Sequence, residues 1–84
     1  MKKVLMFSAS WCQPCQKTKP TFLAVKEQMA DVEMQIVDID ENEHLAQKYD
    51  IRAVPTFVLL NGDIVVAKTS GGLTAEKLKA FVNQ

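Results

Sequence analysis

Two cysteines separated by two residues are the groups in this chain with the clearest chemical potential. Cys12 and Cys15 are its only cysteines, and they lie between a short apolar run and a segment with helical spacing. A thiol at a helix start can be nucleophilic at neutral pH, and a second thiol one turn later can close a disulfide with it. The pair therefore predicts dithiol–disulfide exchange, with Cys12 as the attacking thiolate and Cys15 as the resolving thiol.

The start of the predicted helix should separate the two thiols chemically. Backbone N–H groups and the helix macrodipole stabilise a Cys12 thiolate, whereas Cys15 lies one turn inside, is less exposed and should stay protonated longer. Pro14 falls in the first helical turn, where its missing N–H costs little. The alternative, that both cysteines are small buried hydrophobes, is less favoured because Trp11 and Pro14 frame the pair at a strand–helix junction.

Length and composition limit the classes of partner and compartment. The 84 residues suit one domain, residues 1–84, and their formal net charge of zero argues against a nucleic-acid or membrane partner held by bulk charge. Both cysteines belong to one motif, so neither remains for a structural disulfide. The apolar run after Lys2-Lys3 stops at Ser8, short of the roughly 7–15 residues of a signal-peptide core. We therefore expect a cytoplasmic protein without a transmembrane segment.

Hydrophobic periodicity predicts four strands and three helices. The expected strands are Val4–Phe7, Met34–Ile39, Thr56–Leu60 and Ile64–Lys68. The first helix starts near Cys12, the second follows Asp40 and the third follows Thr74. Spacings of three and four place one set of first-helix residues on a single buried face: Cys15, Thr18, Phe22, Val25 and Met29.

Short local signals predict the helix starts and the hairpin. Asp40 and Glu43 resemble a capping box, and Thr74 is the expected N-cap of the last helix. Asn61-Gly62 is the expected two-residue turn of a hairpin. Leu45 and Tyr49 should lie on the inner side of the second helix, and the last helix should turn inward Ala75, Leu78, Phe81 and Val82.

The order of these elements predicts an α/β fold. It reads β-α-β-α-β-β-α, in which the first βαβ unit should form a right-handed parallel crossover and the tight hairpin must be antiparallel. These two constraints predict a mixed four-stranded sheet with helices on both faces.

Three motifs in this order resemble the thioredoxins. Trp11-Cys12-x-Pro14-Cys15 follows the first strand, Val54-Pro55-Thr56 opens the third, and Gly71 follows the hairpin, over a match from about Val4 to Val82. The resemblance implies a thioredoxin fold and a protein-disulfide reductase that uses no cofactor. It also implies disulfide-containing target proteins, with a flavoprotein thioredoxin reductase or glutathione as electron donor.

The resemblance also implies roles for residues around the cysteines. A cis bond would precede Pro55 and leave the backbone of Val54 free to pair with an extended substrate. Gly71 could allow close approach of the substrate backbone, or could simply form a turn with its neighbour. Trp11 could pack on substrate or cover the helix start, and Pro14 would belong to the same substrate-binding surface.

The chain departs from the thioredoxin pattern in three places. It starts at the family's second strand, which should leave Glu33 to Ile39 as a bare sheet edge, and its acidic residues favour a monomer. Gln13 stands where thioredoxins usually have Gly, between the two cysteines. Met6 stands where they bury an Asp, and Ile36 where they place a neighbouring Lys. Gln13 and Met6 are therefore the residues expected to tune the redox chemistry.

Two other functions remain open from the sequence. A CxxC pair could carry Cu(I), although Trp11 and Pro14 favour exchange over a flexible metal loop. A thioredoxin-shaped chain could also be a non-catalytic binding module, although both thiols are present. No metal site is expected, because a zinc site needs about four ligands and the single histidine, His44, lies far along the chain on a predicted surface helix.

Overall fold

Seven elements follow one another in the predicted order in the computed structural model, which describes all residues from Met1 to Gln84. Their bounds extend or shift the predicted ones by one or two residues at most strand ends. The strands are β1 (Lys2–Ser8), β2 (Glu33–Asp38), β3 (Thr56–Asn61) and β4 (Ile64–Ser70). The helices are α1 (Gln13–Gln28), α2 (Glu43–Lys48) and α3 (Ala75–Val82).

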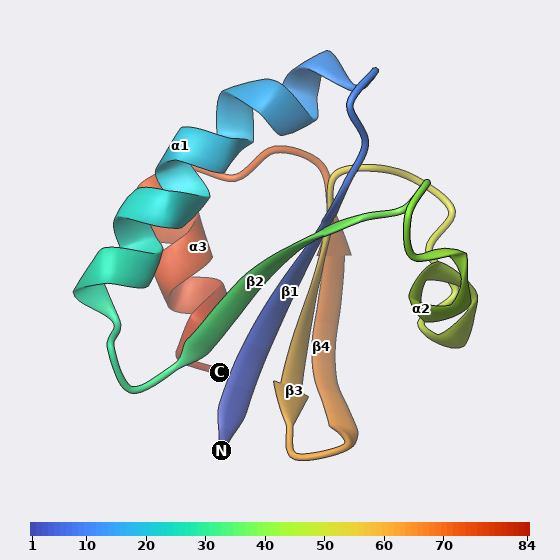
Figure 1. The fold of residues 1–84 in the computed structure, drawn as a ribbon. Helices are drawn as coiled ribbons and strands as arrows, with labels where there is room; N and C mark the ends of the chain where they lie inside the picture. Colours follow the sequence, from blue (N-terminus) through green and yellow to red (C-terminus); the bar gives the residue numbers. More distant parts are fainter.

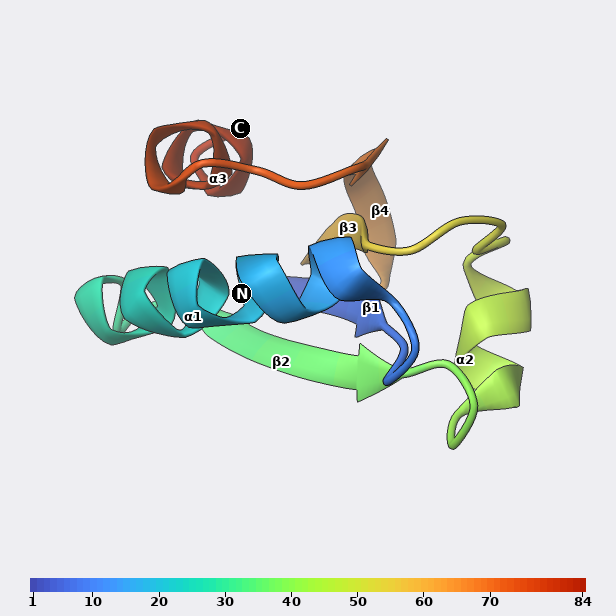
Figure 2. The same cartoon turned by 90° about the horizontal axis from the view of Figure 1, so that it is seen from above.

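The four strands form one mixed sheet in the order β2-β1-β3-β4 (Figure 1). β1 is parallel to β2 and antiparallel to β3, and β4 is antiparallel to β3. α1 and α3 lie on one face of the sheet, and α2 lies on the other (Figure 2). The predicted architecture is therefore confirmed. None of the three helices has the length and apolar character that a bilayer crossing requires.

Strand alternation divides the core into two apolar clusters. Val4 and Met6 on β1 join the larger cluster, under α1 and α3, whereas Leu5 and Phe7 join the smaller one under α2. Successive side chains of a strand point to opposite faces, so a fully apolar strand can supply both clusters. The predicted inner side of α2 is confirmed, because its residues pack on the smaller cluster: Leu45 and Tyr49.

α1 begins where the motif predicts. Cys12 is its N-cap residue, Pro14 lies in its first turn, and the helix continues through Pro20 to Gln28. The predicted apolar face is confirmed by four buried residues, Cys15, Thr18, Phe22 and Val25, and by the partly buried Met29.

The capping box predicted for α2 is wrong. The N-cap residue is Asn42, and its side chain makes no capping hydrogen bond. The reason lies in the turn after β2, where the backbone N–H groups of Glu41 and Asn42 both donate to the Asp38 carbonyl. This turn delays the helix by two residues, and the Asp40 N–H donates to the Asp38 carboxylate (2.8 Å) rather than belonging to a helix start.

The hairpin turn lies one residue later than predicted. Asn61 remains in the sheet, paired with Lys2 on β1 and Ile64 on β4, so that the turn is made by Gly62 and Asp63. Gly62 takes a φ of 63°, which a glycine adopts without steric cost. Pairing with β1 decides the register, which the local Asn-Gly signal could not include.

Thr74 caps α3 as predicted, since its hydroxyl accepts a hydrogen bond from the Lys77 N–H (3.2 Å). Leu78, Phe81 and Val82 are buried, but Ala75 is exposed. The prediction for Ala75 was wrong, because the buried face of α3 begins only at Leu78 and leaves the first turn exposed.

Candidate active site

The two cysteines form a disulfide at the N-terminus of α1. Their Cα atoms lie 5.3 Å apart, and the Cys15 backbone N–H donates to the Cys12 sulfur over 3.2 Å. This donor is one of the N–H groups that a helix start leaves without an intrahelical partner. After reduction, the same contact would stabilise negative charge on Cys12.

Accessibility distinguishes the two sulfur-bearing residues, although both are largely buried in the disulfide form. Cys12 is 6% exposed and Cys15 is fully covered. Cys12 is therefore less open than the sequence suggested, because the loop before β3 covers one side of it. Its sulfur lies 3.6 Å from the Val54 carbonyl oxygen, which a reduced Cys12 thiol could reach as a donor.

The loop before β3 brings the second motif to the cysteines. The Val54–Pro55 bond is cis, as the resemblance implied. The Pro55 carbonyl accepts a hydrogen bond from the Gly71 N–H (2.9 Å), and Gly71 has a φ of 98°. The segments that carry Cys12, Val54 and Gly71 thus meet at one end of the sheet, the upper end in Figure 1.

Trp11 is the largest exposed side chain beside the disulfide, with 66% of its surface accessible. Its indole Nε1–H donates to the Asp40 carboxylate (3.2 Å). Its ring lines a shallow hollow of about 100 Å³ with an otherwise mostly apolar wall that includes Ile39, Ile51 and Val54. Sequence reasoning missed this role of Asp40, because the two residues are 29 positions apart and no local pattern joins them.

Gln13 and Pro14 are exposed at the start of α1, on the surface around the disulfide. Met6 lies in the interior instead. It is fully buried and belongs to the same apolar cluster as Cys12 and Cys15. In the sheet it stands opposite Ile36 on β2, so that the two positions where the resemblance expected an acid and a lysine are adjacent and both apolar.

This fold, with a disulfide that closes a CxxC pair at the start of α1, defines a redox protein of the thioredoxin class. The sequence agrees with this class, since a family model described as thioredoxin matches residues 1–84. The chain belongs to the thioredoxin family.

Individual relatives show how far the likeness extends. Thioredoxin H5 of Oryza sativa subsp. japonica is 39% identical over 69 residues, which cover 82% of this chain and 51% of the rice protein. Thioredoxin of Ovis aries is 35% identical over 81 residues, 96% of this chain and 76% of the sheep protein. The chain thus spans only about half the length of the rice relative.

A solved structure shows the same fold. The X-ray structure of Fasciola hepatica thioredoxin superimposes with a TM-score of 0.92 at 35% identity, and the match covers 98% of this chain and 78% of the other. The four strands and three helices therefore follow the order and arrangement of the matched part of that thioredoxin.

Proposed function

We propose that this chain is a thiol–disulfide oxidoreductase that reduces protein disulfides in the manner of a thioredoxin. The observation that carries the proposal is the Cys12–Cys15 disulfide at the helix start, with Cys12 the more accessible partner and a backbone donor on its sulfur. No observation favours the Cu(I) carrier or the non-catalytic binding module.

The reaction consists of two thiol–disulfide exchanges. The Cys12 thiolate attacks one sulfur of a target disulfide, forms a mixed disulfide and releases the other target sulfur as a thiolate. The Cys15 thiolate then attacks the Cys12 sulfur, releases the second target thiolate and leaves the intramolecular disulfide. Two electrons pass to the target, whose two thiolates take up protons from solvent.

The target segment would lie across the surface formed by Trp11, Pro14, Val54, Pro55 and Gly71. The backbone of Val54 could pair with an extended chain, in the way that an added strand pairs with a sheet edge. A flavoprotein thioredoxin reductase or glutathione would return the disulfide to the dithiol. We also propose that the protein acts in the cytoplasm, because a reducing compartment keeps such a cysteine pair in the dithiol form. We further propose that it acts as a monomer.

Reduction of insulin by dithiothreitol is a direct test. The wild-type chain should accelerate the reaction, and Cys12→Ser should abolish the acceleration. In a separate reaction without dithiothreitol, the pre-reduced Cys15→Ser protein should accumulate a mixed disulfide with insulin, because the first exchange needs only Cys12 and no resolving thiol remains. Wild-type protein that gives no acceleration, or Cys12→Ser protein that retains it, would contradict the proposal.

A further inference from the structure

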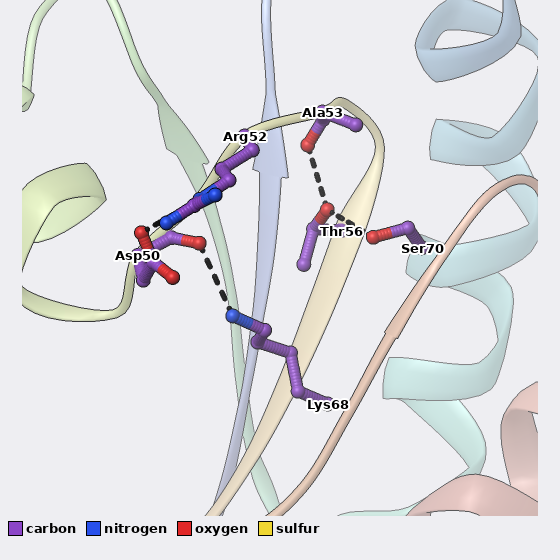
Figure 3. A pocket seen from close by; sticks show the side chains of 6 residues that line it. All are labelled: Asp50, Arg52, Ala53, Thr56, Lys68 and Ser70. Carbon is purple, nitrogen blue, oxygen red and sulfur yellow. Dashed lines mark hydrogen bonds and ion pairs between the residues drawn. The ribbon is translucent and has the colours of Figure 1, made fainter.

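The structure contains a polar hollow of about 450 Å³ (Figure 3). It shares Arg52 and Ala53 with the apolar hollow at Trp11. It opens over the end of the sheet that carries the disulfide. Two of its residues belong to β4 and one to the start of β3, and the rest belong to the segment that joins α2 to β3. The residues that line it are Asp50, Arg52, Ala53, Thr56, Lys68 and Ser70.

The charges of this polar hollow favour an anion. Arg52 and Lys68 outnumber Asp50, the one carboxylate among the lining residues. The Arg52 Nε–H donates to the Asp50 carboxylate (3.1 Å), but the terminal guanidinium nitrogens make no hydrogen bond. The Lys68 ammonium donates to the carbonyls of Tyr49 (3.0 Å) and Asp50 (3.1 Å), which leaves one of its three N–H donors free.

The hydroxyl groups in the hollow are already satisfied. Thr56 donates to the Ala53 carbonyl (2.6 Å), so the hydrogen between Thr56 and Ser70 (2.8 Å) must come from Ser70. The side-chain donors that remain for a ligand therefore belong to the two cations. A carboxylate, which accepts hydrogen bonds and carries negative charge, matches such a set.

Arg52 connects the polar hollow to the reactive disulfide. It lines both hollows, and its side chain is 84% exposed. The apolar hollow also contains Val54, whose carbonyl lies 3.6 Å from the Cys12 sulfur. A chain that pairs with Val54 at the disulfide would pass the apolar hollow and then reach the guanidinium.

We propose that the two hollows select target disulfides whose flanking sequence places an apolar side chain against Trp11 and an acidic side chain between Arg52 and Lys68. This assignment of target class rests on the proposed function. Arg52 acts here as a residue that determines specificity, and Asp50 weakens the selection because it competes for the same guanidinium.

Reduction of paired synthetic peptides tests the proposal. Each peptide carries a leucine near a disulfide-bonded cysteine and one Glu at a successive position on either side, and its partner peptide has Gln there. At the preferred position we expect kcat/KM to be about two- to fivefold higher for Glu than for Gln, which is the effect of one exposed ion pair. Salt should reduce this ratio, because screening weakens exposed ion pairs.

Four variants relate the ratio to the polar hollow. Arg52→Gln should lower the Glu/Gln ratio toward one, leaving only what Lys68 contributes, and Arg52→Lys should restore part of it. Asp50→Asn should raise the ratio, since it removes the competing charge and Asn tolerates the backbone conformation at this position. Lys26→Gln removes an exposed charge from α1, on the opposite face of the sheet, and should leave the ratio unchanged.

The outcomes separate this proposal from the function on which it rests. Wild-type protein that reduces Glu and Gln peptides equally at every position would overturn acidic selection and leave the reductase intact. A ratio that is unchanged in Arg52→Gln, or that falls equally in Lys26→Gln, would also overturn it. Wild-type protein that reduces neither peptide would overturn the reductase function, and the target class with it.

Discussion

Cys12 and Cys15 differ in the contacts that their sulfur atoms can use. The Cys12 sulfur accepts the Cys15 N–H and lies near the Val54 carbonyl, whereas Cys15 is fully covered by the core cluster. The backbone donor stabilises a thiolate on Cys12, and the apolar surroundings disfavour one on Cys15. The helix start thus gives two identical side chains different chemical roles.

This difference predicts where a limiting alkylating agent reacts. Iodoacetamide added below stoichiometry to the reduced protein should label chiefly Cys12, because the thiolate is the nucleophile and Cys12 is the more accessible residue. Peptide mapping by mass spectrometry measures the distribution. A label found chiefly on Cys15 would reverse the assigned roles, and alkylation of the urea-unfolded protein, where the two thiols should react alike, is the control.

Met6 places an apolar side chain in the cluster that contains both cysteines. We predict that Met6→Asp lowers the free energy of unfolding at neutral pH by several kcal/mol, because the introduced carboxyl must be buried. Burial raises the folded-state pKa of that carboxyl above its unfolded value of about 3.9. The stability that the Met6→Asp protein loses relative to the parent should therefore be smallest at acid pH and grow as pH rises from about 4 to the folded-state pKa of the new carboxyl.

Urea midpoints from pH 4 to 9 measure this effect, with Met6→Asn as the matched control. The amide is also polar but does not titrate, so its cost should not depend on pH beyond that of the parent. Met6→Asp should also add a titration to the pH dependence of mixed-disulfide resolution. If its stability and its profile match the parent's, Met6 does not lie beneath the active site.

At the scale of elements, the end of α2 shows how a short helix is stopped before the active-site loop. The Ile51 N–H donates to the Ala46 carbonyl (2.8 Å), and the Asp50 N–H donates to the Gln47 carbonyl (3.1 Å). These two bonds form a Schellman motif, in which the residue after the C-cap adopts a left-handed conformation. Asp50 has a φ of 53° at this position, where glycine is more common.

We predict that Asp50→Gly raises the free energy of unfolding by about 0.5–1 kcal/mol, because glycine removes the steric cost of a left-handed residue. The exposed Asp50–Arg52 ion pair that is lost contributes little. Urea denaturation measures the change. Asp50→Ala is the control: it removes the same carboxylate but keeps Cβ, so it should not stabilise, and an equal gain in both variants would show that charge, not conformation, matters.

At the scale of the whole molecule, the sheet has two exposed edges, β2 and β4. β2 carries Glu33 and Asp38 at its two ends, and charged residues discourage pairing between edges. β4 interrupts its ladder with an irregularity opposite Leu59 and Leu60, which also hinders pairing with a second chain. Its exposed apolar residues, Ile64, Val65 and Val66, make it the edge at greater risk of association.

We therefore predict a monomer at micromolar concentration. Sedimentation velocity should give one species with the mass of a single chain, 9.4 kDa, across that range. A stable dimer would contradict this prediction. Val65→Lys and Glu33→Gln would then identify the edge involved, because the former should dissociate a β4 dimer and the latter should strengthen a β2 dimer.

Local patterns were sufficient to predict the order of the helices and strands, the mixed four-stranded sheet, the buried face of α1 and Thr74 as the N-cap of α3. Each of these depends on residues within one helical turn or a few strand positions, so their spacing in the sequence carries the information. The Cys12–Cys15 pair was predictable for the same reason, and the resemblance to thioredoxins added Val54, Pro55 and Gly71 around it.

Only the tertiary structure decided which distant groups meet at the site. The Trp11–Asp40 hydrogen bond, the Cys12–Val54 approach and the two hollows that share Arg52 join segments that are far apart in the chain. The hairpin moved by one residue because Asn61 pairs with β1, which no local signal records. Contacts of this kind depend on how strands and loops pack in space, and therefore the sequence determined the reactive pair while the fold determined its surroundings.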